Sequence, residues 1–407
     1  MGKFFYLCDK LRAMDTWFGV LLLFILPIFF ALGWFAARMD IGAVLKQAKS
    51  VPEHLYQSLD ALIDRKSNIA ARSLSEIVEQ MIDDKNNDIT AHALGLSLGK
   101  LYRQRGENDK AIAMHQALLA SPDTVGEKRE RVLYELGLNY KSAGLVDRAE
   151  QIFLELKNGN MAKQANELLL HIFQQDRDWQ QAIETAKLLA HDEQTYQFEI
   201  AQFYCELAQA ALFQSDFQTA REYVQAALNA NKKCTRANMI LGDIEQKQGN
   251  FQAAINAYSA IEKQNYAYLS MVGEKLYDAY DALGKPQEGL NVLIGYSKTF
   301  LQLDLLNVIH EKSLLLNGES VANQTALELI RLKPDLNGMY RLLGFQISTL
   351  NPLWKNDADM MRGVLAQQLQ KSRMYRCRHC HFKSQVYFWH CPACNKWETF
   401  TPNKIEV

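Results

Sequence analysis

The sequence has little proline or glycine, few cysteines and no excess of either charge. Its 407 residues include only 8 prolines and 21 glycines, so long helices are rarely interrupted. The 45 Lys and Arg residues nearly balance the 46 Asp and Glu residues. A chain with that balance lacks the general attraction that basic proteins have for nucleic acids. Its 7 cysteines are an odd and sparse set, which excludes a secreted disulfide framework.

Recognisable catalytic motifs are also lacking. The segment from Gly95 to Lys100 resembles a phosphate-binding loop only superficially, because its glycines are too close together and Leu101 stands where Ser or Thr would hold Mg²⁺. His310 and Glu311 lack the second histidine of a metalloprotease motif. No base-bearing motif surrounds Cys8, Cys205 or Cys234, and we interpret them as small apolar residues. The sequence therefore predicts a protein that is not an enzyme.

One long apolar run is present near the N-terminus. Thr16 to Ala37 carries no charge and has Trp17 and Trp34 near its ends, as membrane helices do at the lipid–water interface. Its length matches the hydrocarbon thickness of about 30 Å. A cleaved signal peptide is the alternative, but its apolar core would be only about 7–15 residues long. The run predicts a transmembrane helix.

Basic residues do not orient this helix, because Lys3, Lys10 and Arg12 before it match Arg38, Lys46 and Lys49 after it. The cysteines do. Four close thiols would pair in an oxidising compartment but stay free for metal in the cytoplasm. We therefore expect a single-pass membrane protein with most of the chain in the cytoplasm.

Between about residues 50 and 350 the sequence repeats itself. Leu-Gly-x-x-Tyr patterns and later small residues recur around seven anchor positions: Gly99, Gly137, Leu170, Ala208, Gly242, Tyr277 and His310. Their spacing is close to the tetratricopeptide period of about 34 residues. A small residue follows each anchor at the same distance: Ala111, Ala149, Ala182, Ala220, Ala254, Gly289 and Ala322. Small residues are expected where the two helices of a repeat approach most closely.

Two further features complete the repeat region. A weak unit with Ala70, Leu74 and Val78 on one helical face precedes the first anchor, and Pro334 marks the end of the last repeat. Helices over about 337–350 and 357–372 should cap the stack.

The chain is therefore predicted to be mainly α. It contains an N-terminal tail (1–15), a transmembrane helix (16–37), a repeat superhelix of about seven to nine units (50–350), a capping helix and linker (351–373) and a small metal domain (374–402).

The metal domain contains two C-x-x-C pairs, formed by Cys377 and Cys380 and by Cys391 and Cys394. Two such turns can place four thiolates around one tetrahedral ion, and zinc and iron both accept this set. Tyr375, Trp389, Trp397 and nearby aromatic residues would supply a small apolar shell. A redox dithiol is less consistent, because no βαβ pattern surrounds the pairs. We interpret His379, His381 and His390 as surface or supporting residues.

Two other functions fit parts of this pattern. Arg373, Arg376, Arg378 and Lys383 could make the metal domain a nucleic-acid-binding zinc ribbon on a repeat scaffold, although a neutral chain with a membrane anchor argues against it. An electron-transfer protein of the rubredoxin type would require iron with a reversible redox signal.

The whole pattern resembles the lipopolysaccharide assembly protein B family of Gram-negative bacteria. The segments that carry the resemblance are Tyr102–Glu107, Ala111–Gln116, Ala143–Glu150, Phe203–Ala208 and Tyr375–Cys394. Two features depart from the family: the tail of about 15 residues before the span, and His381, which stands where a glycine is common and must accept a glycine-like turn.

The resemblance implies a function that spacing alone does not. Members of the family are cytoplasm-facing adaptors of the bacterial inner membrane that help the membrane protease FtsH degrade the lipid A pathway deacetylase, and so limit lipopolysaccharide synthesis. An inner-membrane lipopolysaccharide-sensing protein restrains them. Lipopolysaccharide itself and a second copy of the chain are further candidate partners, and nucleic acid is not expected. The family's metal ligands correspond to Cys377, Cys380, Cys391 and Cys394. A repeat superhelix presents a concave groove for peptides or helices. We hypothesise that this groove binds the deacetylase and that the metal domain docks against the repeats.

Overall fold

The computed structural model describes residues 27–31, 33–34, 69, 88–190, 196–347, 351–372 and 374–402. The described chain is mainly helical, as predicted, and ends in a small metal-binding-type domain with two short strands. It divides into two compact units, Met1–Met161 and Ala162–Val407. Each unit is considered by itself below.

The part of the first unit that the structure describes from residue 88 onward contains two helical hairpins. They are formed by α4 (Asp88–Gln104) with α5 (Asn108–Ala120) and by α6 (Glu127–Ser142) with α7 (Val146–Leu156).

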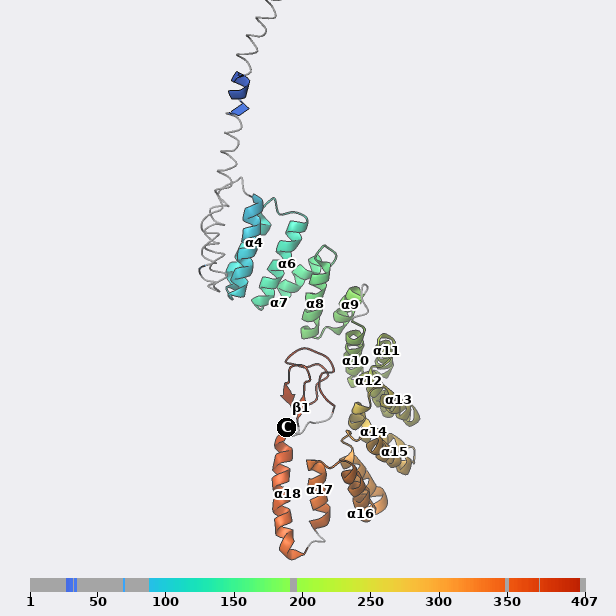
Figure 1. Cartoon of the computed structure of the whole chain (residues 1–407). Helices are drawn as coiled ribbons and strands as arrows, with labels where there is room; N and C mark the ends of the chain where they lie inside the picture. The colour runs from blue at the N-terminus through green and yellow to red at the C-terminus, as the bar shows by residue number, and fades with distance from the viewer. Residues whose placement is uncertain are drawn as a thin grey trace, which may run out of the picture. The chain divides into compact units, whose positions relative to one another are not determined.

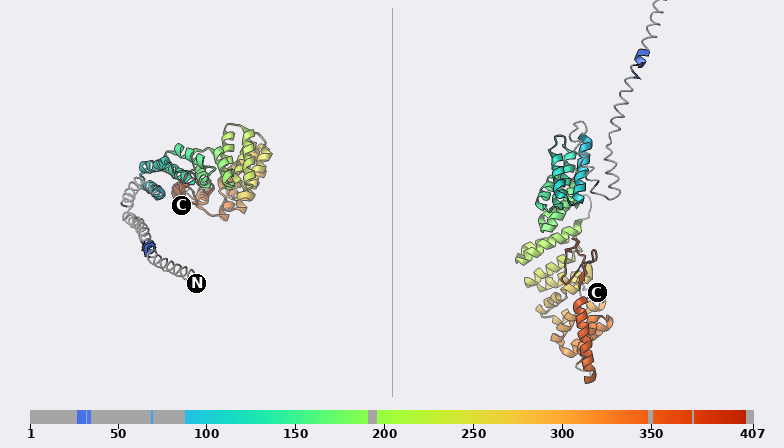
Figure 2. Two further views of the ribbon diagram at one scale, coloured as in Figure 1. Left: turned by 90° about the horizontal axis from the view of Figure 1, so that it is seen from above. Right: turned by 90° about the vertical axis from the view of Figure 1, so that its left-hand side faces the viewer.

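The second unit continues the same pattern with consecutive hairpins stacked side by side (Figure 1). The helices that form its hairpins are α8 (Ala162–Asp176), α9 (Trp179–Ala190), α10 (Gln197–Phe213), α11 (Phe217–Ala230), α12 (Thr235–Lys247), α13 (Phe251–Asn265), α14 (Leu269–Ala282) and α15 (Pro286–Thr299). A single 3₁₀ turn, η2 (Tyr266–Tyr268), joins α13 to α14. Figure 2 shows these hairpins following one another along the unit. The arrangement is that of tetratricopeptide repeats.

Close approach of the paired helices explains the glycine anchors. At Gly137 in α6, an added Cβ would lie 2.6 Å from a ring carbon of Phe153 in α7. The same clash would occur between Gly242 and the ring of Tyr258. Phe153 and Tyr258 are both fully buried. The small residue therefore makes room for an aromatic ring from the second helix of the same hairpin, as the sequence pattern predicted.

The turn between the helices of each hairpin needs a left-handed residue seven positions after the anchor. Gly144 has φ +77° and Gly249 has φ +78°, and glycine adopts this conformation without steric cost. The third and fourth repeats place Arg177 (φ +59°) and Ser215 (φ +62°) there instead. These two repeats therefore lack the glycine of the turn but keep the same left-handed backbone.

The stacked hairpins are stabilised by buried apolar residues, which form two large clusters in the second unit. One cluster fills the space between α10, α11 and α12, and a second extends from α12 through α15 to α16. The small residues predicted in the second helices are fully buried: Ala111, Ala149, Ala182, Ala220, Ala254 and Ala322. Each hairpin thus buries its apolar face against its neighbours, which is how repeat proteins obtain their stability.

The array ends in the segments α16, α17 and α18. The segment α16 (Leu306–Leu332) contains a break at Gly318, where φ is +80° and ψ is 174°, so it corresponds to both helices of the last repeat. It is followed by α17 (Leu336–Gln346) and α18 (Pro352–Ser372). The last helix begins about one turn before the residue expected from the sequence. It packs on α17 and leaves Leu353 and Trp354 exposed.

Three sequence predictions fall on residues outside this description. They concern the N-terminal tail, most of the span from Thr16 to Ala37, and the weak first repeat around Ala70. Among the described residues, no helix has both the length and the apolar character needed to cross a membrane.

Candidate metal centre and its docking surface

The C-terminal domain, residues 374–402, which we call the knuckle, is built from two tight turns and a short sheet. β1 (Tyr375–Arg376) pairs antiparallel with β2 (Lys383–Ser384). The N–H of His381 donates to the carbonyl of Cys377 at 3.0 Å, and the N–H of Asn395 donates to that of Cys391 at 2.9 Å. Each pair of cysteines is therefore held in the same kind of turn.

Both turns close on a left-handed residue. His381 has φ +62° and Asn395 has φ +54°. Asparagine enters this region more readily than most residues, and so does histidine to a smaller extent. The expectation that His381 must accept a glycine-like conformation is therefore confirmed, and the turn is retained without glycine.

The four cysteine sulfurs converge on one point. Cys377 Sγ lies 3.8 Å from Cys394 Sγ, Cys380 Sγ lies 3.7 Å from Cys391 Sγ, and all four lie within 4.8 Å of one another. In a tetrahedral site with metal–sulfur bonds of about 2.3 Å, neighbouring sulfurs would be about 3.8 Å apart. The arrangement fits one metal ion held by four thiolates. It does not separate zinc from iron, because both take this geometry.

The electrostatic setting of Cys377 favours the thiolate needed for binding. Burial opposes ionisation, but the N–H of Cys380 points at the sulfur from 3.5 Å and the Thr399 hydroxyl lies 3.2 Å away. Together these contacts lower the pKa of Cys377 to about 6. Thus the turn that spaces the first pair of cysteines also stabilises the negative charge on Cys377, whereas burial raises the pKa of Cys391 and of Cys394.

The nearby histidines lie outside the four-sulfur cluster. His390 stacks on Trp397, with ring centres 4.5 Å apart, and burial lowers the pKa of its imidazole. His379 and His381 are exposed. These positions match the supporting or surface roles expected for them.

Trp397 anchors the knuckle to the repeats. Its ring lies 5.7 Å from that of Trp179 in α9 and 5.8 Å from that of Phe203 in α10, in edge-to-face contacts. Its indole nitrogen donates to Gln174 Oε1 in α8 at 3.4 Å. Edge-to-face aromatic pairs add roughly 0.5–1.5 kcal/mol to the free energy gained by area burial.

A second aromatic contact lies further along the array. Trp389 stacks on Tyr268 at 5.2 Å, and the hydroxyl oxygens of Tyr387 and Tyr268 share a hydrogen bond of 3.0 Å. The guanidinium of Arg236, in α12, lies 5.2 Å from the ring of Trp389. Figure 1 shows the knuckle beside these helices. Docking of the knuckle against the repeats is therefore observed.

A buried carboxyl group completes the contact. Glu398 Oε1 accepts a hydrogen bond of 2.8 Å from the side-chain amide of Gln202 in α10. Burial raises the pKa of Glu398, although Gln202 and Arg236 favour its charged form. Arg236 is itself buried and pairs with Glu206 at 2.9 Å. The Glu398 carboxyl and the Arg236 guanidinium thus each have a polar partner, which lowers the cost of burying them, whereas Gln202 Oε1 and His390 Nε2 are buried without a hydrogen-bond partner among the described residues.

Sequence reasoning found the knuckle but not the residues that receive it. Gln174, Trp179, Gln202, Arg236 and Tyr268 lie in no short motif. Two of them share a positional signal, because Gln202 and Arg236 both stand six residues before an anchor, at Ala208 and Gly242. A polar side chain at that repeated position marks the side of the first helices that the knuckle contacts.

Two cysteines outside the cluster lie under this contact. Cys205 and Cys234 are buried, with sulfurs 3.7 Å apart. Burial is the main cause that raises the pKa of Cys205, which agrees with its interpretation as an apolar residue. Cys8 lies outside the described residues.

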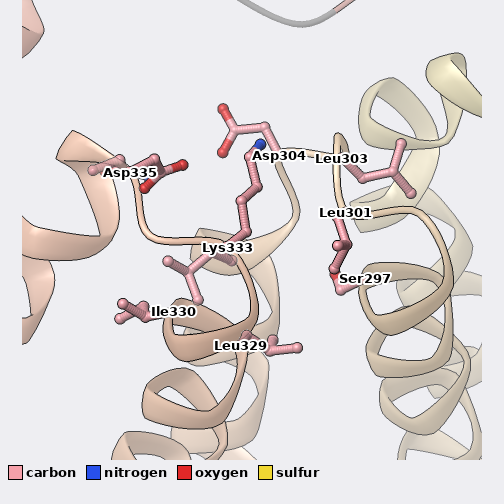
Figure 3. Close-up of a pocket in the computed structure, with 10 residues that line it drawn as sticks. Ser297, Leu301, Leu303, Asp304, Leu329, Ile330, Lys333 and Asp335 are labelled. Atoms are coloured by element: carbon pink, nitrogen blue, oxygen red, sulfur yellow. The ribbon is translucent and has the colours of Figure 1, made fainter.

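A pocket is present near the end of the array, between α15, α16 and α17 (Figure 3). Asp304, Lys333 and Asp335 are among the residues that line it. Asp335 Oδ1 accepts a hydrogen bond of 2.6 Å from the N–H of Gly338 and so caps α17. Of the two carboxylates that line the pocket, that of Asp335 thus has a structural role.

Family comparisons agree with this division of the chain. Residues 375–402 match a Zn-ribbon family described as a rubredoxin metal binding domain. Residues 93–129 and 205–268 match tetratricopeptide repeat families. A chain of the solved Cut9–Hcn1 hetero-tetramer is 17% identical, with coverage of 74% of this chain and 56% of that chain, at a TM-score of 0.28.

Two curated relatives match almost end to end. Lipopolysaccharide assembly protein B of Escherichia coli K12 is 26% identical over 390 residues, which is 94% of this chain and 97% of the relative. The protein of the same name from Haemophilus influenzae is 26% identical over 94% of this chain and 98% of its own length. The chain is therefore similar to lipopolysaccharide assembly protein B along nearly its whole length, as its sequence motifs predicted.

Proposed function

We propose that this protein is a non-catalytic adaptor of the bacterial inner membrane that limits lipopolysaccharide synthesis. In this role it would present the lipid A pathway deacetylase to the membrane protease FtsH. The single observation that carries the proposal is the similarity to lipopolysaccharide assembly protein B over 94% of the chain. The stacked repeats and the docked knuckle support it, because a scaffold of this kind offers binding surface without reactive groups.

The parts of the chain have separate tasks in this proposal. The segment from Thr16 to Ala37 forms a membrane anchor, and most of the remaining chain lies in the cytoplasm. The repeats over about 50–350 bind the partner proteins. Cys377, Cys380, Cys391 and Cys394 hold one zinc or iron ion, which fixes the knuckle against the repeats. An inner-membrane lipopolysaccharide-sensing protein would restrain the adaptor.

Anchoring works by raising local concentration. Two proteins confined to one membrane meet far more often than they would in solution, and no catalysis by the adaptor is required. The repeats then need only to bind the deacetylase until the protease engages it.

The test is a variant that lacks residues 16–37 but keeps the rest of the chain. In cells, we expect the deacetylase half-life to lengthen to that of a strain without the adaptor. The purified variant should still bind the deacetylase as tightly as the full chain does. Loss of that direct binding would contradict the tether mechanism, and an unchanged half-life on deletion of the whole gene would contradict the function.

A further inference from the structure

The knuckle uses defined positions of the repeat, and the same positions exist in the first unit. Gln202 and Arg236 stand six residues before their anchors and contact Glu398 and Trp389. Gln174 stands four residues after its anchor, Leu170, and contacts Trp397. Because repeats superpose by position, the equivalent residues of the first unit belong to the same kind of binding surface.

In the first unit three of these four positions are basic, and the fourth is Ala93. Arg131 stands six residues before Gly137, Lys141 stands four residues after it, and Arg103 stands four residues after Gly99. The knuckle contacts described above all involve repeat residues after 162. Most of the positions that hold the knuckle in the second unit therefore carry cationic side chains in the first.

The nearby carboxylate does not neutralise this surface. Glu135 in α6 pairs with Lys100 through one oxygen and with Arg103 through the other, each at 2.8 Å. Arg131 is exposed, and burial lowers the pKa of the Lys141 ammonium. A partly buried cation is costly unless an anion compensates it. Both carboxylate oxygens of Glu135 are thus already engaged by Lys100 and Arg103. Arg131 and Lys141 are two further cations on the same helix.

The same stripe has apolar character. Tyr134 and Leu138 lie between Arg131 and Lys141 at helical spacing and are partly exposed, so the four side chains follow one face of α6. A stripe of two cations flanking two apolar side chains is complementary to an extended or helical segment that carries acidic and apolar residues together.

We propose that this basic stripe, formed by Arg131, Tyr134, Leu138 and Lys141 with Lys100 beside it, binds an acidic, apolar-containing segment of the protein that the adaptor delivers. The proposal rests on the adaptor function and adds where its cargo binds and by what chemistry. In the second unit the chain's own knuckle takes the equivalent surface. In the first unit the occupant is a different protein.

The test uses the full-length, metal-loaded protein in a non-ionic detergent. The probe is a fluorescein-labelled peptide of alternating Glu and Leu, and its binding is followed by fluorescence anisotropy. A peptide with Lys in place of Glu measures the contribution of charge. The variant R131E/K141E reverses both cations of the stripe. The control K247E/K263E reverses two exposed lysines of α12 and α13 and changes the net charge by the same amount.

We expect the acidic peptide to bind the unaltered protein and the control, and the lysine peptide to bind neither. R131E/K141E should weaken binding at least about tenfold, and added salt should weaken it in the unaltered protein. No binding of the acidic peptide, or equal loss in both variants, would overturn the proposal. So would a monomer–dimer equilibrium shifted by R131E/K141E alone without peptide binding, because a second copy would then be the occupant.

A measurement in cells separates this proposal from the adaptor function. R131E/K141E should lengthen the deacetylase half-life, whereas K247E/K263E should not. If R131E/K141E abolishes peptide binding but leaves that half-life unchanged, the cargo binds elsewhere and the present proposal is wrong. The adaptor function itself fails only if removing the whole protein has no effect.

Discussion

The hairpin of α6 and α7 and the knuckle both turn their backbones through left-handed residues, but they are stabilised differently. In the hairpin, Gly137 admits the ring of Phe153, and apolar burial continues into the neighbouring helices. In the knuckle, each strand is two residues long, and the buried side chains include Cys377, Cys391 and Phe400. So small a domain cannot bury enough apolar surface to fold alone. It depends on its thiols and on the surface that receives it, whereas a repeat depends on its neighbours.

Removing one thiol should have the largest effect, because it should unfold the knuckle and leave the repeats folded. Cys391→Ser should lose the bound ion and unfold residues 375–402, because structural tetrathiolate sites contribute roughly 10–16 kcal/mol of apparent binding free energy. Helix content should fall little, because the helices lie outside the knuckle. Metal analysis and far-ultraviolet circular dichroism measure the two effects. Lys396→Ala, an exposed neighbour, is the control, and full metal retention in Cys391→Ser would contradict the assignment.

The reciprocal change acts on the repeats. Phe153→Ala empties the space opposite Gly137 and should lower the free energy of unfolding of the first unit by about 3–5 kcal/mol, with metal content unchanged. Phe213→Ala is a matched control, because Phe213 is 89% exposed and should change stability by less than about 0.5 kcal/mol. Urea unfolding followed by circular dichroism tests both. Similar midpoints for the two variants would show that the hairpin does not depend on this contact.

Docking of the knuckle against the repeats should depend on pH through Glu398. Its pKa is raised by burial, so the docked state binds the proton more tightly than the undocked state. That contribution is complete below the ordinary carboxyl pKa of about 4.3 and is lost as pH rises through the raised value. Glu398→Gln should therefore strengthen docking near neutral pH and flatten its pH dependence.

Hydrogen exchange of the α10 amides between about pH 5 and 8 would follow this docking. Exposed Glu184→Gln is the control and should leave the pH dependence intact. A profile for Glu398→Gln that coincides with that of the unaltered protein would show that this carboxyl does not titrate with docking.

The smallest effect concerns the turns. Ser215 occupies a left-handed position where other repeats have glycine, and a non-glycine residue there costs roughly 1–2 kcal/mol. Ser215→Gly should raise the stability of the second unit by up to about 1 kcal/mol, because glycine also adds entropy to the unfolded chain. Gly144→Ala should change the first unit in the opposite direction. Thermal unfolding of both variants measures the difference, and destabilisation by Ser215→Gly would mean that the serine side chain offsets its strain.

Sequence reasoning succeeded where one local pattern determines one local structure. The Gly137 type of anchor and the two C-x-x-C pairs each report geometry within a short stretch of chain, and both geometries are present. It could not identify Gln202, Arg236 or Tyr268 as the surface that receives the knuckle, because those contacts join residues far apart in the chain. Nor could it show that Arg177 and Ser215 adopt a glycine-like turn, since the surrounding packing imposes that conformation.

The reach of the knuckle along the array has a consequence for how the protein unfolds. Repeat arrays usually behave as a chain of neighbours, in which one end can fray while the other stays folded. Here Gln174 in α8 and Tyr268 before α14 both contact the knuckle, so repeats that do not touch each other share one partner. Opening any of them weakens the same contact. The middle of the array is thereby given cooperativity over a longer range than nearest-neighbour stacking provides.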